Sequence, residues 1–162
     1  MSSDSTNTTT PVSISVSYNG KLVNEGDKMN PFQTIDQPRI FIDDSRSPGP
    51  TSYSVIMIDR NASRPFTTGP LLTYVHYWAV FSASNAASPA RMVRTLAPYV
   101  QPAPHDLLLH KYEFLVYENS PFTTSPPANY LYNVGARYTT TLQNLISPLE
   151  NPLGSTFFIE QL

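Results

Sequence analysis

The chain has 162 residues, a formal net charge of −2 and no cysteine, and these properties exclude several classes of protein. A nearly balanced charge without a basic cluster argues against nucleic acid binding and allows at most peripheral contact with a membrane. The lack of cysteine excludes disulfides, thiolate zinc sites and cysteine nucleophiles. The sequence shows neither an apolar leader nor an apolar run of membrane-spanning length, so we expect one cytoplasmic domain.

The composition predicts an all-β fold of short strands and long loops, because sixteen prolines and many aromatic residues accompany little helical periodicity. Residues 1–11 are mostly polar and low in complexity, and we expect them to form a disordered tail. Residues 12–162 are predicted to form a single domain, since the alternation of apolar and polar residues begins at Val12.

The predicted elements follow in chain order and are separated by turn signals. The strongest of these signals is Asn19-Gly20, which favours a tight hairpin. The segments expected to form strands are residues 12–16, 22–23, 39–42, 53–59, 74–81, 109–118 and 155–160. The segment 85–94 is expected to be irregular. One helix is predicted over residues 134–146, where apolar residues recur at helical spacing after an N-capping Asn133.

The most informative segment is the predicted strand 109–118, in which His110 and Tyr112 are two residues apart. Side chains at this spacing lie on the same face of a strand, so both can line one cavity. Asp59 ends another predicted strand, and His76 lies within a third. Imidazole and phenol groups donate hydrogen bonds to oxyanions, whereas a carboxylate does not, so Asp59 would orient and charge a histidine. These residues together predict a small anion-binding pocket.

Four segments, in order along the chain, resemble the phosphatidylethanolamine-binding protein family, whose members include Raf-kinase inhibitor protein. They correspond to an opening hairpin with its following strand, an apolar strand that runs into an aspartate turn, a histidine–tyrosine strand and a closing strand. These segments are residues 15–40, 53–62, 109–117 and 151–158. The resemblance spans about residues 12–162 and implies a two-sheet β-sandwich with one or few short helices.

The resemblance also implies a set of site residues and a function. Asp59, His76, Pro104, His110 and Tyr112 would line a pocket for a phosphate-bearing small molecule or a phospholipid headgroup. Members of the family bind without catalysing a reaction and regulate a kinase, a protease or another signalling partner. We therefore expect a non-enzymatic regulator that requires no cofactor and no metal ion.

Four departures from the family pattern leave the details of the pocket open. The aspartate turn continues as Arg60-Asn61-Ala62-Ser63, so two prolines and a second carboxylate are missing. Leucines occupy residues 107–109, where glycine is usual before the histidine. Tyr77 instead of His76 could occupy the family's other histidine position. The chain also stops directly after the predicted closing strand, so we expect a pocket with an open mouth.

Other functions are compatible with some of these residues. The departures favour an interaction or scaffold protein whose pocket is vestigial. A hydrolase has the least support, because the sequence contains no Gly-x-Ser-x-Gly nucleophile motif. A zinc site could draw on Asp59, His76, His105 and His110, but their spacing matches no compact ligand motif.

Overall fold

The computed structural model describes residues 11–46, 52–62, 72–82, 87–104, 106, 108–118, 137–139 and 151–161. Within these ranges the chain forms ten strands and no α-helix. The strands are β1 (Val12–Tyr18), β2 (Lys21–Val23), β3 (Lys28–Met29), β4 (Arg39–Asp44), β5 (Ser52–Ala62), β6 (Leu72–Ser82), β7 (Met92–Ala97), β8 (His110–Glu118), β9 (Tyr138–Thr139) and β10 (Gly154–Glu160). Among the described residues, no helix is long and apolar enough to cross a membrane.

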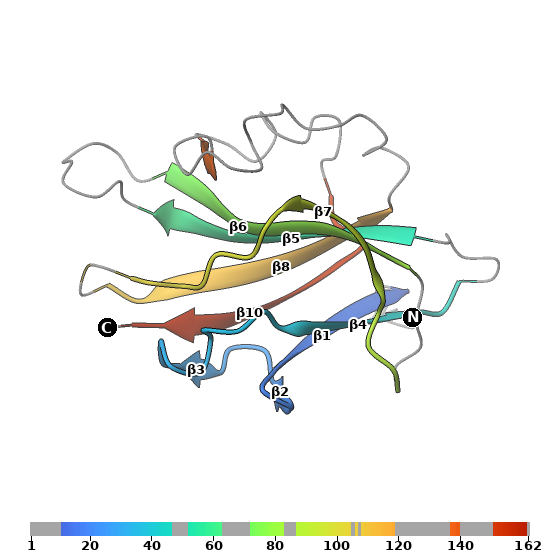
Figure 1. The fold of residues 1–162 in the computed structure, drawn as a ribbon, viewed down its shortest axis with the longest axis horizontal. Coiled ribbons are helices and arrows are strands. Elements are labelled where there is room, and N and C mark those ends of the chain that lie inside the picture. Colours follow the sequence, from blue (N-terminus) through green and yellow to red (C-terminus); the bar gives the residue numbers. More distant parts are fainter. Residues whose placement is uncertain are drawn as a thin grey trace, which may run out of the picture.

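The strands form two sheets, and β1, β2 and β4 lie below the larger sheet in Figure 1. The smaller sheet has the order β2-β1-β4. The seven-stranded sheet has the order β3-β10-β8-β5-β6-β7, and β9 pairs with β6 off this path. All described pairs are antiparallel except β3 with β10. The predicted two-sheet, all-β architecture is confirmed.

The main core lies between the two sheets, where the inward side chains of both meet. The smaller sheet contributes Val12, Ile14, Val16, Tyr18, Val23, Ile40 and Ile42, and the larger sheet contributes mainly Tyr53, Val55, Met57, Tyr77, Phe81, Tyr112, Phe114 and Phe158. A second buried cluster, which includes Ile56, Ile58, Val75 and Trp78, lies on the other face of the larger sheet. Because both faces of β5 and β6 are buried, these strands are apolar at nearly every position.

Two glycines determine local features of the sandwich. The β1–β2 hairpin turns through Asn19 (φ 52°) and Gly20 (φ 80°), as a two-residue turn of the primed class requires. An added Cβ at Gly154, the first residue of β10, would lie 2.5 Å from the carbonyl oxygen of Val12. A residue with a side chain would therefore clash there, and glycine allows β10 to approach β1.

The structure corrects part of the predicted element map. The helix expected over residues 134–146 is wrong at Tyr138 and Thr139, which form β9 and pair with β6, because backbone pairing to a sheet edge outweighs a local helical pattern. Apart from Arg137, the rest of that segment lies outside the described residues, as do residues 1–10 of the predicted tail. Strand β7 includes the end of the segment that was expected to be irregular.

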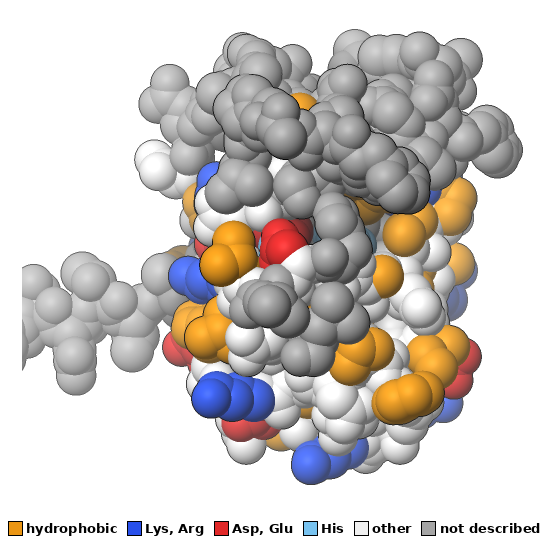
Figure 2. All heavy atoms as spheres, turned by 90° about the vertical axis from the view of Figure 1, so that its left-hand side faces the viewer, with side chains coloured by type: hydrophobic (Ala, Val, Ile, Leu, Met, Phe, Trp, Pro, Cys, Tyr) orange, Lys and Arg blue, Asp and Glu red, His pale blue; other side chains and the backbone are white. Residues whose placement is uncertain are grey.

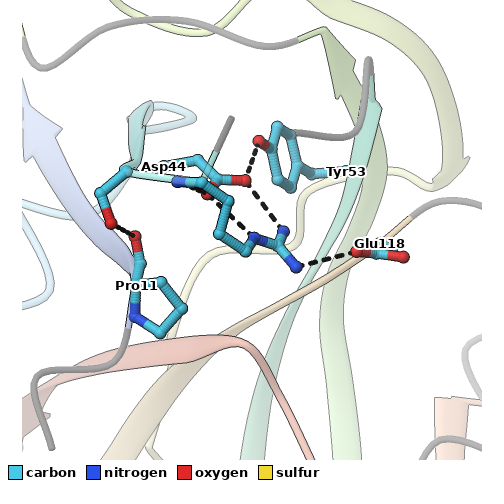
Figure 3. Close-up of polar contacts among 6 residues, drawn as sticks. Pro11, Asp44, Tyr53 and Glu118 are labelled. Atoms are coloured by element: carbon cyan, nitrogen blue, oxygen red, sulfur yellow. Dashed lines mark hydrogen bonds and ion pairs between the residues drawn. The ribbon is translucent and has the colours of Figure 1, made fainter. Parts of the chain in front are cut away.

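A polar cluster lies at the end of the sandwich where β4 and β8 end and β5 begins (Figure 3). Arg46 bonds Asp44 through Nε and Nη2 at 3.0 and 2.9 Å, and it bonds Glu118 through Nη1 at 2.9 Å. The Tyr53 hydroxyl donates to Asp44 at 2.6 Å. The hydrogen bonds from Arg46 and Tyr53 hold the pKa of Asp44 well below its usual range. We call these four residues the Arg46 cluster.

Candidate functional site

The predicted site residues lie at the opposite end of the sandwich, on the left of Figure 1, where β8 begins and β5 and β10 end. Cross-strand pairing aligns Asp59 with Tyr112 and His110 with Glu160. Residues paired across an antiparallel sheet point to the same face. All four side chains are therefore directed to the face of the larger sheet that carries the main core.

His110 is enclosed by two carboxylates. Its side chain is only 4% exposed, and its Nδ1 lies 2.7 Å from Asp59 Oδ2. Its Nε2 lies 2.7 Å from Asp106 Oδ1. Carboxylate oxygens accept hydrogen bonds, so with both carboxylates ionised both ring nitrogens donate, as in a doubly protonated imidazolium. We call His110, Asp59 and Asp106 the His110 cluster.

The two carboxylates determine the charge on His110. Burial by itself would lower the pKa of His110, but the hydrogen bonds and charges of Asp106 and Asp59 raise it above its ordinary value. Burial raises the pKa of Asp59, and the Asn61 and His110 N–H groups limit that rise. The Asn61 backbone N–H donates to Asp59 Oδ1 at 2.9 Å. This bond forms within a register irregularity of β5 between Asp59 and Ala62.

A β-bulge places His76 on the same face. Met57 pairs with Tyr77 and Ile58 pairs with Val75, so His76 is the extra residue of β6. The His76 ring meets the Tyr112 ring edge-on at 5.1 Å, and Tyr77 belongs to the same core. Neighbouring residues of a regular strand point to opposite faces, but the bulge lets both residues face inward.

Hydrogen bonds to Val100 and Arg137 fix the orientation of His76. Its Nδ1–H donates to the Val100 carbonyl at 2.8 Å, and the Val100 N–H donates to the His76 carbonyl at 2.8 Å. Arg137 Nη1 donates to the carbonyls of Val75 and His76 at 3.1 and 3.2 Å. Burial, together with the charges of Arg137 and His110, lowers the pKa of His76 to about 4. His76 is therefore neutral near neutral pH, with Nε2 as an acceptor, and donating to an anion would require its protonation.

Tyr112 lies between the two histidines. Its ring is roughly parallel to those of His110 and Phe158, at centroid distances of 6.3 and 5.4 Å. Burial and the charge of Asp59 raise the pKa of Tyr112, so it remains a phenol. Pro104 is buried in the segment that joins β7 to β8. The structure thus brings Asp59, His110, Tyr112 and His76 together, and direct ligand contacts remain a prediction.

Glu160 adds a third carboxyl group to this end of the sheet. Its side chain is among the fully buried ones, and burial raises its pKa to about 7. The Thr34 hydroxyl donates to Oε2 at 3.0 Å, and the charge of His110 limits the rise of the pKa. Oε1 is buried and has no hydrogen-bond partner among the described residues. Glu160 therefore changes its protonation near neutral pH.

Sequence reasoning missed Asp106, Glu160 and Arg137. Asp106 precedes β8 in a proline-rich segment and carries no motif. Glu160 follows Phe158 at strand spacing, and this spacing would have indicated an inward carboxylate. Arg137 lies in the segment that was assigned to a helix, and the basic residue gave no separate signal there.

The surface around the His110 cluster combines acid and apolar groups. Figure 2 shows this end of the molecule, with an acidic side chain near the centre and apolar side chains on both sides of it. Four large exposed apolar residues belong to the segments before β4 and β8, and these are Phe32, Ile35, Leu108 and Leu109. The bond from Thr34 to Glu160 connects the first of these segments to the site.

The described residues contain no group of three or more histidine, aspartate or glutamate residues that could hold a metal ion. His105, which the alternative zinc set includes, lies outside the described residues. What the His110 cluster offers is a buried imidazole whose two nitrogens both bond anionic oxygens. This chemistry suits the recognition of an oxyanion.

Comparison with known proteins identifies the fold. No family model matches the chain. A carboxypeptidase Y inhibitor, solved in complex with its cognate proteinase, is 16% identical and superposes with a TM-score of 0.67 over 93% of this chain and 83% of that chain. A phosphatidylethanolamine-binding protein from Plasmodium falciparum is 18% identical, with a TM-score of 0.60 over 93% of this chain and 85% of that chain. The chain has the fold of the phosphatidylethanolamine-binding proteins, as the sequence motifs predicted.

Proposed function

We propose that this chain is a non-enzymatic member of the phosphatidylethanolamine-binding protein family that binds an oxyanion at His110. The observation that carries the proposal is the buried His110 ring between two carboxylates, whose outer nitrogen bonds the oxygen of a partly exposed carboxylate. A phosphate oxygen could accept the same hydrogen bond, and such charge-assisted bonds are stronger than neutral ones. The expected ligand is a phosphate-bearing small molecule or a phospholipid headgroup.

The affinity should be modest. His110 carries one positive charge, while Asp59 and Asp106 contribute two negative charges beside it. His76 adds no charge near neutral pH because its pKa is about 4. His110 thus provides the attraction for the ligand, and we propose the Tyr112 phenol as a further donor.

A partner protein is part of the proposal. The exposed Phe32, Ile35, Leu108 and Leu109 provide apolar area around the site that a partner could cover. One protein of the same fold is named for inhibition of a carboxypeptidase, which supports testing a protease as the partner. The other partners that the family resemblance implies are a kinase or another signalling protein.

A specific observation favours a second candidate, an interaction or scaffold protein with a vestigial pocket. Asp106 already bonds the outer nitrogen of His110. If no ligand can replace it, the cluster would serve only the stability of the fold, and the apolar surface would carry the function.

Titration calorimetry with inorganic phosphate and with phosphoethanolamine separates the two candidates. We expect both ligands to bind wild type, and His110→Gln, which keeps a polar side chain without the charge, to bind at least roughly tenfold more weakly. Lys111→Ala is the matched control, because this neighbouring cation is half-exposed and lies at the next strand position. Equal binding by wild type and His110→Gln, or no binding by either, would overturn the oxyanion function.

A further inference from the structure

The two carboxylates of the His110 cluster differ in their access to solvent. Asp59 lies within β5, its side chain is 4% exposed, and its second oxygen accepts the Asn61 N–H. Asp106 lies in the segment before β8, and its side chain is 27% exposed. A molecule that arrives from solvent therefore reaches the Nε2 side of His110, where Asp106 is bound, before the Nδ1 side.

Two N–H groups converge on a single oxygen of Asp106. Oδ1 lies 2.7 Å from His110 Nε2 and 3.0 Å from the backbone nitrogen of Leu108. A ring N–H and a backbone N–H that point at one anionic oxygen form a small oxyanion position, with a charge-assisted bond and a neutral bond. The carboxylate of the chain itself occupies this position.

The charges around His110 prevent a second anion from binding beside Asp106. Both ring nitrogens already donate, and one imidazolium faces two carboxylates. Among the described residues, Glu160, whose pKa lies near 7, the phenol of Tyr112 and the neutral ring of His76 also interact with the cluster. An additional anion would find no available His110 N–H, and the three described side chains of the cluster carry no excess of positive charge.

We infer that Asp106 is an internal competitor that occupies the oxyanion position, and that an external anion binds by replacing its carboxylate. This inference rests on the proposed function of His110. The incoming oxygen would accept the His110 Nε2–H and the Leu108 N–H, so the Leu108 backbone amide becomes a binding group of the site. One anion replaces another on the same ring, and the measured affinity is the intrinsic affinity multiplied by the fraction of molecules in which Asp106 has left His110.

Removing the competitor should strengthen binding. The ligand must break a hydrogen bond between charged groups, which typically contributes about 1.5–3 kcal/mol, so Asp106→Ala should bind inorganic phosphate roughly 10- to 100-fold more tightly than wild type. Asp106→Asn keeps the side-chain oxygen that can accept the Leu108 N–H but removes the charge, and it should show an intermediate gain. Asp36→Asn removes an exposed negative charge whose field reaches Tyr99, and it should change the affinity less than roughly twofold because Asp36 lacks this contact.

The test is a calorimetric titration of the four proteins with inorganic phosphate, acetate and phosphoethanolamine at constant ionic strength, with the Leu108 amide followed by NMR. Acetate imitates the Asp106 carboxylate and tests whether an external carboxylate can replace it. Inorganic phosphate and phosphoethanolamine distinguish a free anion from a lipid headgroup. We expect tighter binding by both Asp106 variants and a shift of the Leu108 amide. If wild type binds more tightly than His110→Gln but the Asp106 variants bind no better than wild type, the competitor role is wrong and the oxyanion function stands. If none of the four binds any of the three anions, both are wrong.

Discussion

The two ends of the sandwich each hold a cation between two carboxylates, but the cations differ in kind. In the Arg46 cluster a guanidinium bonds Asp44 and Glu118, and its charge does not depend on pH in the physiological range. In the His110 cluster an imidazole has the same arrangement between Asp59 and Asp106. The charge of an imidazole does depend on pH in this range, and the neighbouring carboxylates favour its second proton.

The two ends also differ in how deeply their charged side chains are buried. The Arg46 side chain is about one-third exposed and Glu118 more so, whereas His110 and Asp59 are almost fully covered. Exposed ion pairs contribute little to stability, while a buried charge that loses its partner is costly. The difference indicates that the Arg46 cluster makes a small contribution to stability by connecting strand ends. In the His110 cluster, by contrast, losing the charge or exchanging its partner should have large effects on stability or binding.

The largest effect is expected from His110→Ala. This change leaves the Asp59 carboxylate buried without its cation, which typically destabilises a protein by about 3–5 kcal/mol. Urea denaturation near neutral pH measures the free energy of unfolding. The double variant Asp59→Asn/His110→Ala should recover part of the loss, because the amide carries no charge. A double variant as unstable as the sum of the two single variants would show that the pair is not coupled.

Glu160→Gln should make the free energy of unfolding decrease less as the pH rises. The pKa of Glu160 is raised from 4.5 to about 7 in the fold, so the folded state binds the extra proton. Its contribution is fully present below pH 4.5 and is lost as the pH rises through about 7. The loss amounts to about 3 kcal/mol at most. Denaturation of wild type and Glu160→Gln on both sides of this range should show a smaller decrease for the variant, and parallel curves would contradict the assignment.

His76→Gln should change how the free energy of unfolding depends on pH in the acidic range. Burial lowers the pKa of His76 from 6.5 to about 4, so the unfolded state binds the extra proton. The contribution of His76 is present above pH 6.5 and is lost as the pH falls through about 4, by about 3 kcal/mol at most. The variant is expected to be less stable near neutral pH, because it loses the ring packing, and to have a flatter pH profile in this interval. An unchanged profile would assign the acid sensitivity to another group.

The smallest effect is expected from Arg46→Lys. A single ammonium cannot bond Asp44 through two nitrogens and also reach Glu118, and the partial exposure of the cluster limits the loss to about 1 kcal/mol. Because Asp44 has a strongly lowered pKa, this loss should be constant from mildly acidic to mildly alkaline pH. Thermal denaturation at several pH values measures it. A loss of stability that varies with pH would contradict the difference between the two ends, because it would mean that the Arg46 cluster also titrates.

Part of this organisation could be predicted from the sequence. Alternation in β8 placed His110 and Tyr112 on one face, because strand geometry imposes a period of two. The hairpin at Asn19 and Gly20 followed from the backbone conformation that these residues tolerate. The resemblance of four segments predicted the fold that comparison with solved structures then identified.

Other features depend on irregularities that leave no mark in a single sequence. The bulge at His76 makes both His76 and Tyr77 face inward, and alternation alone cannot predict an inserted residue. Asp106 reaches His110 from a segment without secondary structure, so no periodicity points to it. Tyr138 has helical spacing to its apolar neighbours but lies in β9, because pairing with β6 decided its conformation.

The most direct test of the difference between the two ends is an NMR titration of wild type with inorganic phosphate, followed at the side-chain N–H groups of His110 and Arg46. We predict that the His110 ring is doubly protonated before phosphate is added, because both its nitrogens donate to carboxylates. Phosphate should then shift the Nε2–H signal of His110 and leave the Nε–H signal of Arg46 unchanged. A neutral His110 ring, or a response at Arg46 without one at His110, would contradict the assignment of the anion site.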